Sequence, residues 1–152
     1  MFTLVPSQFF DPAAARDALA EVTEVKEGDA VSYLDIPQYD AVLVYTPDED
    51  SVVNGTPEIF RILDRLQDCP EYNKILFSRK DDRLYLAIAQ GKSLLLANSF
   101  AARDFTSAEY YIFLALKSLQ LNPEISTICA LSPLDDEDEM SLYRYFKSVV
   151  RL

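Results

Sequence analysis

The stretch KILFSRKDDRLYLAIAQGKSLLLANSF, residues 74–100, decides the fold of this chain. Three apolar runs alternate in it with two short polar segments, which predicts consecutive strands over Lys74–Ser78, Leu84–Ala89 and Ser93–Phe100. The first polar segment, 79–83, is charged throughout. The second contains Gly91, which can adopt the positive φ that a tight hairpin turn requires. We therefore expect a three-stranded antiparallel meander.

The residues after the meander predict helix, strand and helix. A helix is expected from Ser107 to Leu119, opened by a capping box of Thr106 and Glu109. The apolar, β-branched run Ile125–Leu131 predicts a fourth strand, and a last helix is expected over Leu134–Val150. The order β-β-β-α-β-α is that of a ribonuclease-H-like unit, which actin-like ATPases contain twice. The predicted fold class is therefore α/β with a mixed sheet.

The residues before Pro70 predict a shorter series of elements. In order these are strand, helix, strand, strand and helix, over 2–5, 11–19, 30–34, 41–45 and 48–68, with Asp48–Asp50 as an acidic first turn and Gly55 as an interruption. This series resembles the later part of a second such unit. We therefore expect a partial first subdomain over 1–69 and a complete second subdomain over 70–152.

Several short motifs resemble a known family. They are Phe2–Pro6, the aromatic pairs Phe9-Phe10 and Tyr110-Tyr111, Asn98–Phe100, and Leu121–Glu124. Together they resemble the uncharacterised DUF3822 family of Bacteroidetes. The resemblance implies an actin-like ATPase fold and gives no activity. It also implies longer relatives, so the chain is expected to lack the first strands of the fold.

Composition excludes several kinds of chemistry. The 152 residues include no histidine and only 3 glycines, so histidine-dependent triads and glycine-rich phosphate loops are absent from the sequence. The net charge of −11 disfavours nucleic acid and anionic membrane surfaces. Cys129 lies in an apolar run and Cys69 precedes Pro70 in a predicted loop, so neither a disulfide nor a metal site is expected. Without a signal peptide or a long apolar segment, a cytoplasmic location without membrane insertion is expected.

The sequence lacks residues that the two enzyme classes with this fold, nucleases and ATPases, need for catalysis. A nuclease of the ribonuclease H type needs carboxylates on the first and fourth strands, where this sequence has none. An actin-like ATPase needs glycine in the hairpin that here spans residues 79–83. Arg79, Lys80 and Arg83 are weak phosphate-binding candidates if a nucleotide binds, although a charged, solvent-facing turn also explains them. We expect no catalytic residue, no cofactor and no metal.

The candidate interface residues are aromatic. Tyr110 and Tyr111 point to different sides of one predicted helix, so one is expected in the core and the other is available to a partner. Phe100 is the third interface candidate. The acidic run 135–139 begins the predicted last helix, and Arg144, Lys147 and Arg151 lie toward its end, a polarity that complements the helix dipole without a ligand.

The sequence predicts a non-catalytic protein-interaction module with a degenerate actin-like fold. The alternative is a nucleotide-binding ATPase completed by missing N-terminal strands or by a second protomer. If the opening strands are missing, the strand Ala41–Tyr45 or a neighbour has an open edge. Such an edge pairs readily with another chain, so a homodimer or a larger assembly is expected. The protein partner itself is unknown.

Overall fold

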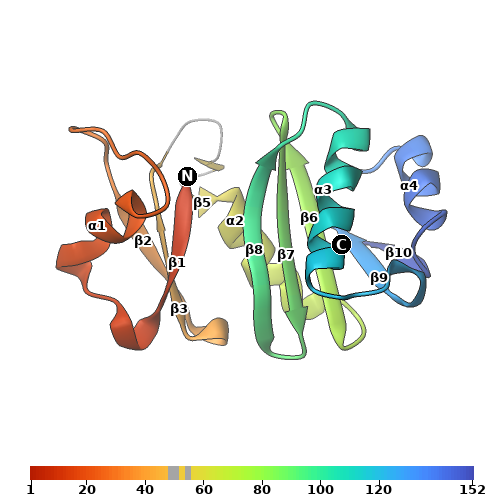
Figure 1. Ribbon diagram of the computed structural model, residues 1–152, viewed down its shortest axis with the longest axis horizontal. Coiled ribbons are helices and arrows are strands. Elements are labelled where there is room, and N and C mark those ends of the chain that lie inside the picture. The colour runs from red at the N-terminus through yellow and green to blue at the C-terminus, as the bar shows by residue number, and fades with distance from the viewer. Residues whose placement is uncertain (48–51, 54–55) are drawn as a thin grey trace. The chain divides into compact units, whose positions relative to one another are not determined.

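The computed structural model describes residues 1–47, 52–53 and 56–152, in two compact units, Met1–Phe60 and Arg61–Leu152 (Figure 1). The division lies inside helix α2 (Glu58–Arg65), before the boundary expected at Pro70. It lies earlier because Ile62, Leu63 and Leu66 are buried and the segment after α2 contacts the second sheet. The acidic turn expected over 48–50 and Gly55 lie outside the described residues.

The second unit is a five-stranded mixed sheet with the order β10-β9-β6-β7-β8. Its strands are β6 (Asn73–Lys80), β7 (Arg83–Gln90), β8 (Ser93–Ala101), β9 (Thr127–Ala130) and β10 (Ser148–Arg151). Strands β6, β7 and β8 form the predicted antiparallel meander. Strand β9 runs parallel to β6, and β10 runs parallel to β9. Gly91 has φ +56° in the β7–β8 turn, as that turn requires.

The end of the chain corrects the sequence prediction. The expected helix over 134–150 is only α4 (Asp136–Tyr143), and a fifth strand, β10, follows it. The β-branched pair Val149-Val150 extends the sheet along β9, where Val149 is buried. Lys147 and Arg151 therefore lie beyond the helix whose dipole they were expected to complement. Lys147 pairs with Glu71 at 2.9 Å, and Arg151 pairs with Glu139 at 2.5 Å.

The two helices predicted after the meander each begin two residues away from the expected start. Helix α3 (Phe105–Ser118) is capped by Asp104, whose carboxylate accepts the backbone N–H of Ser107 at 2.7 Å. The capping box of Thr106 and Glu109 is therefore wrong, because Asp104 is an equally good cap two residues upstream. Helix α4 is capped by Asp135 in the same way, from the backbone N–H of Asp138 at 2.8 Å.

One face of the second sheet packs against α3, as Figure 1 shows. Because side chains alternate along a strand, this face takes every second residue of β6 and β7. The helix contributes small and branched side chains one turn apart. Residues of this core include Ile75, Phe77, Leu84, Leu86, Ile88, Ala108, Ile112, Ala115, Leu116, Ile128 and Ala130. Phe146, in the segment between α4 and β10, and Val149 of β10 belong to the same core.

The first unit contains a three-stranded antiparallel sheet with the order β1-β3-β2. Its strands are β1 (Phe2–Pro6), β2 (Ser32–Ile36) and β3 (Ala41–Tyr45), and α1 (Ala15–Ala20) packs on one face against Val42 and Val44. A short hairpin, β4 (Val52–Val53) and β5 (Thr56–Pro57), precedes α2. Strand β3 is fully buried between β1 and β2, so the open edge expected at this strand or a neighbour falls on its neighbours β1 and β2.

Candidate interaction surface

The β6–β7 hairpin is where an actin-like ATPase would bind phosphate. Strand β6 extends through Lys80 and β7 begins at Arg83, so the turn is only Asp81-Asp82. Both aspartates have positive φ, +50° and +59°, as a two-residue hairpin of type I′ requires. The expected five-residue loop is therefore wrong. The tip of this hairpin carries two carboxylates, which repel a phosphate group.

The structure does not bring the three basic candidates together. Arg79 lies on the helix-covered face, where its guanidinium is 5.8 Å from the ring centre of Phe105. Lys80 and Arg83 are cross-strand partners on the opposite face, and the Arg83 guanidinium donates to the Ser99 hydroxyl at 2.9 Å. Opposite faces of one sheet cannot converge on a single phosphate. These residues therefore do not form one anion site.

The helix-covered face also shows what occupies the nuclease positions. Phe77 on β6 and Ala130 on β9 are in register, and both are buried. Glu109 on α3 therefore finds no carboxylate at these two positions with which to share a metal ion. Within the described ranges, no group of three or more acidic, cysteine or histidine side chains is placed to hold a metal.

Glu109 is a buried acid between α3 and α4. The residue is 9% exposed, and its Oε1 atom has no hydrogen-bond partner among the described residues. Burial raises the pKa of the Glu109 carboxyl, while a hydrogen bond from Ser141 opposes this shift and the charge of Asp138 adds to it. Burial also raises the pKa of Asp138 itself. The ionised form of Glu109 therefore costs stability.

Glu109→Gln is expected to stabilise the protein at neutral pH by about 1 kcal/mol, because it removes an incompletely paired buried charge. A pKa raised by folding gives stability that is present at acidic pH and lost as the pH rises through the folded pKa. The advantage of the variant should therefore vanish near pH 4, the usual range of glutamate. Urea denaturation at several pH values measures this. Glu124→Gln removes the same charge from an exposed site and is the matched control.

Three aromatic side chains from β8 and α3 form one cluster. The rings of Phe100 and Tyr111 are stacked, with centres 4.8 Å apart and planes at 14°. Tyr110 meets the Tyr111 ring edge-on at 5.3 Å. All three interface candidates are therefore in one cluster. Tyr110 is 60% exposed and Tyr111 is half-buried, so Tyr110 is the one available to a partner.

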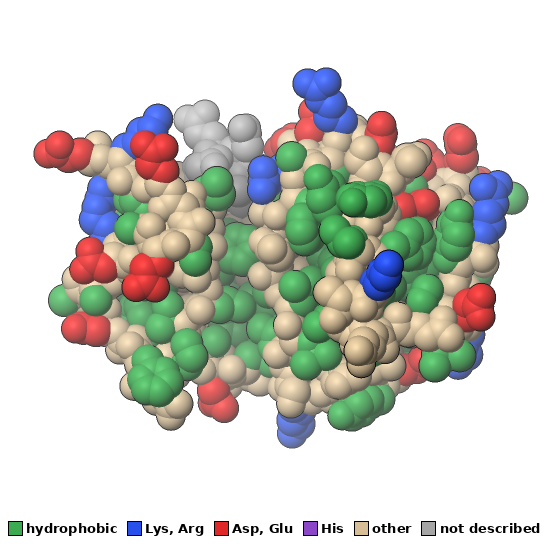
Figure 2. All heavy atoms as spheres, viewed as in Figure 1, with side chains coloured by type: hydrophobic (Ala, Val, Ile, Leu, Met, Phe, Trp, Pro, Cys, Tyr) green, Lys and Arg blue, Asp and Glu red, His purple; other side chains and the backbone are tan. Residues whose placement is uncertain are grey.

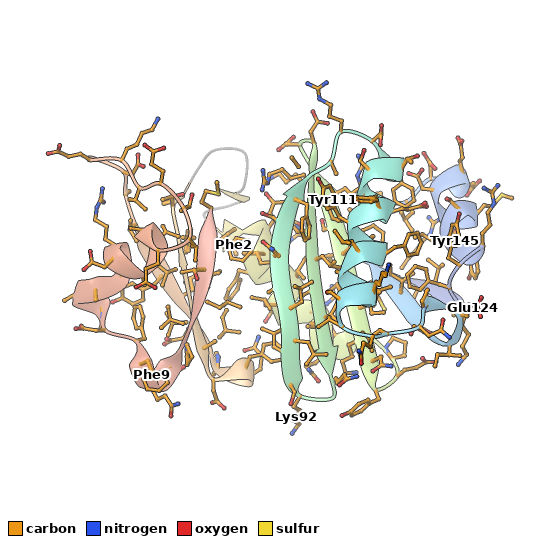
Figure 3. The ribbon with its side chains drawn as sticks, viewed as in Figure 1. Phe2, Phe9, Lys92, Tyr111, Glu124 and Tyr145 are labelled. Carbon is orange, nitrogen blue, oxygen red and sulfur yellow. The ribbon has the colours of Figure 1, made fainter. Side chains whose placement is uncertain are left out.

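The same helix extends this cluster into a larger surface. Leu114 lies one turn after Tyr110 and is 48% exposed. On the other side of α3, the ring centre of Phe113 is 4.8 Å from that of Tyr145 and 5.8 Å from that of the core residue Phe146. We call the set of Phe100, Tyr110, Tyr111, Phe113, Leu114 and Tyr145 the aromatic surface. Figure 2 shows hydrophobic side chains gathered over α3, and Figure 3 shows Tyr111 and Tyr145 at the two sides of this helix.

Half of the aromatic surface, namely Phe113, Leu114 and Tyr145, was not identified from the sequence. The spacing of four residues between Tyr110 and Leu114 places both on one stripe of a helix, and this signal was available. Tyr145 gave no such signal, because the sequence placed it within a long last helix. Its contact with Phe113 depends on α4 ending at Tyr143 and on the chain then turning back toward β10.

The chain has the actin-like ATPase fold, and this likeness is one of fold alone. A solved protein from Bacteroides thetaiotaomicron, described as having an actin-like ATPase fold and unknown function, superimposes with a TM-score of 0.77 at 19% identity. The alignment covers 99% of this chain and 64% of that one. The chain belongs to the family described as a protein of unknown function, DUF3822, whose model matches residues 1–149. No curated protein matches the chain.

The helices give one further finding. In the part of the chain that the structure describes, none is both long and apolar enough to cross a membrane.

Proposed function

We propose that this chain is a non-catalytic protein-interaction module, which binds a partner protein through the aromatic surface of its second unit. The observation that carries the proposal is the exposed Tyr110 beside the stack of Tyr111 and Phe100. Tyrosine is enriched in protein interfaces because its ring offers a large apolar area and its hydroxyl a hydrogen bond. The stack limits the motion of these rings, which lowers the entropy lost on binding.

The position of the aromatic surface supports this function. It is supplied by a helix and an adjoining strand, which hold the rings in place more firmly than loops do. Its exposed stripe, Tyr110 and Leu114, is uncharged and ends at Lys117. A partner that presents apolar side chains fits this stripe. The net charge of −11 favours a basic partner, whose association slows as salt is added.

Site-specific photocrosslinking tests the proposal. A photoreactive phenylalanine derivative replaces Tyr110 in one variant and Tyr72 in the control, because Tyr72 is 67% exposed and lies outside the aromatic surface. In cells of the native host, the Tyr110 variant should crosslink to one defined protein, and the Tyr72 variant should not. The same products from both positions, or no product from Tyr110, would contradict a binding role for this surface.

Self-association through the first unit is a separate proposal. Strands β1 and β2 flank β3 and leave the outer edges of this sheet without a further strand among the described residues. Such edges pair with edges of other chains, so a homodimer or a larger assembly is the expected state. Light scattering at high protein concentration measures it, and a strictly monomeric mass would contradict it.

A further inference from the structure

Cys69 and Cys129 are far apart in the sequence and adjacent in the second unit. Cys69 ends the short 3-10 segment η4 (Leu66–Asp68) after α2, and Cys129 lies in the middle of the sheet, on β9. The Cys69 carbonyl accepts a hydrogen bond from the Lys74 ammonium at 2.5 Å. Lys74 and Leu76 share one face of β6, and Leu76 is in register with Cys129. The two thiols therefore lie on the face opposite α3, beside Lys74.

The two thiol groups lie close enough for each to shift the pKa of the other. Both residues are free cysteines, and they are 2% and 0% exposed. Interaction with the Cys69 thiol lowers the pKa of the Cys129 thiol and the positive charge of Lys74 acts in the same direction, while burial opposes the shift. The same interaction, together with burial, raises the pKa of Cys69. Two neighbouring thiols, of which the one with the lower pKa loses its proton more readily beside an ammonium group, are the arrangement from which a disulfide forms.

We propose that Cys69 and Cys129 are a redox-sensitive dithiol, which a peroxide converts to an intramolecular disulfide. The Cys129 thiolate attacks one oxygen of the peroxide, the O–O bond breaks, and the departing hydroxide takes a proton to become water. The resulting sulfenic acid is attacked by Cys69, which forms the S–S bond and releases its proton and the hydroxide as a second water. Two thiols are oxidised, and one hydrogen peroxide is reduced to two waters.

The connection between α2 and β6 is the route by which a small oxidant would reach these sulfurs. Cys69 is buried, but its neighbours Asp68, Pro70, Glu71 and Tyr72 are all exposed. Glu71 has φ +74°, which is unfavourable for a residue with a side chain, and an exposed pair with Lys147 holds it. Exposed connections of this kind open locally at low cost. Once formed, the disulfide fastens this connection to β9.

The test uses the whole reduced protein under native conditions. Hydrogen peroxide is the first oxidant. Diamide is the second, because it takes two hydrogens from a thiol pair and leaves the exposed Met1 and Met140 unoxidised. Intact mass should fall by two hydrogens with diamide, no thiol should react with iodoacetamide after denaturation, and a peptide pair joining Cys69 to Cys129 should be found. The midpoint temperature should rise by roughly 5–10 °C and return to its starting value after reduction.

Cys69→Ser and Cys129→Ser are the matched variants. Each should keep its remaining thiol and show no loss of two hydrogens. The measurement on the wild-type protein tests the proposal by itself, even if either variant folds poorly. Two alkylatable thiols after treatment of the folded wild-type protein, or a disulfide that forms only between chains or only in guanidinium chloride, would overturn the proposal.

Discussion

Phe77→Ala is expected to lower the free energy of unfolding by about 3–5 kcal/mol, the usual cost of removing a fully buried aromatic ring. Phe77 is 0% exposed on β6, and its ring centre is 6.3 Å from that of Phe105 on α3. Its carbonyl also accepts the backbone N–H of Leu131 at 2.9 Å. Loss of this ring leaves a cavity between the central strand and α3, which the surrounding strands cannot fill without distorting the sheet.

Urea denaturation measures the effect of Phe77→Ala, with an unchanged m-value as the sign of intact two-state unfolding. Leu114→Ala is the control, because its side chain is 48% exposed on the same helix-covered side and should cost about 1 kcal/mol or less. A cost below about 1 kcal/mol for Phe77→Ala would show that α3 does not pack on β6 as described.

Tyr110→Ala is expected to weaken binding of the crosslinked partner by about 10- to 100-fold, which is the loss typical of an aromatic residue at the centre of an interface. Stability should change little, because Tyr110 is 60% exposed. Tyr111→Phe keeps the stack on Phe100 and should retain binding, whereas Tyr111→Ala should weaken it by removing the support of Tyr110. Calorimetric titration of the purified partner measures all three.

The control for these titrations is Tyr72→Ala, which removes an exposed tyrosine from a different part of the unit. It should change the affinity by no more than about twofold. Equal losses for Tyr72→Ala and Tyr110→Ala would show that the aromatic surface is not the binding site.

Local patterns predicted the elements whose signals are contained in a few consecutive residues. The alternation of apolar and polar residues over 74–100 gave all three strands of the meander, and Gly91 marked its second turn. The helix α3 followed from the run of apolar residues after Thr106, with its start two residues away from the predicted one. These signals survive because strand and helix periodicity depend on neighbours in sequence.

Other features depend on contacts that the sequence does not display. Val149 and Val150 form a strand because the edge of β9 is available to them, and the acidic residues before them suggested only a helix. The stack of Phe100 on Tyr111 joins β8 to α3, and the pairing of Cys69 with Cys129 brings together two distant segments. The turn Asp81-Asp82 was predicted as part of a longer polar segment, 79–83, because all five residues of that segment are charged.

Calorimetric titration with magnesium-ATP tests most directly whether this chain functions without binding a nucleotide. Two carboxylates at the β6–β7 turn and the separation of Arg79 from Lys80 and Arg83 leave the phosphate without a converging set of donors. The predicted result is no saturable binding, with any Kd weaker than about 1 mM, and no magnesium-dependent phosphate release. Saturable binding with a Kd of about 1 µM together with hydrolysis would contradict the non-catalytic function and favour a nucleotide-binding ATPase.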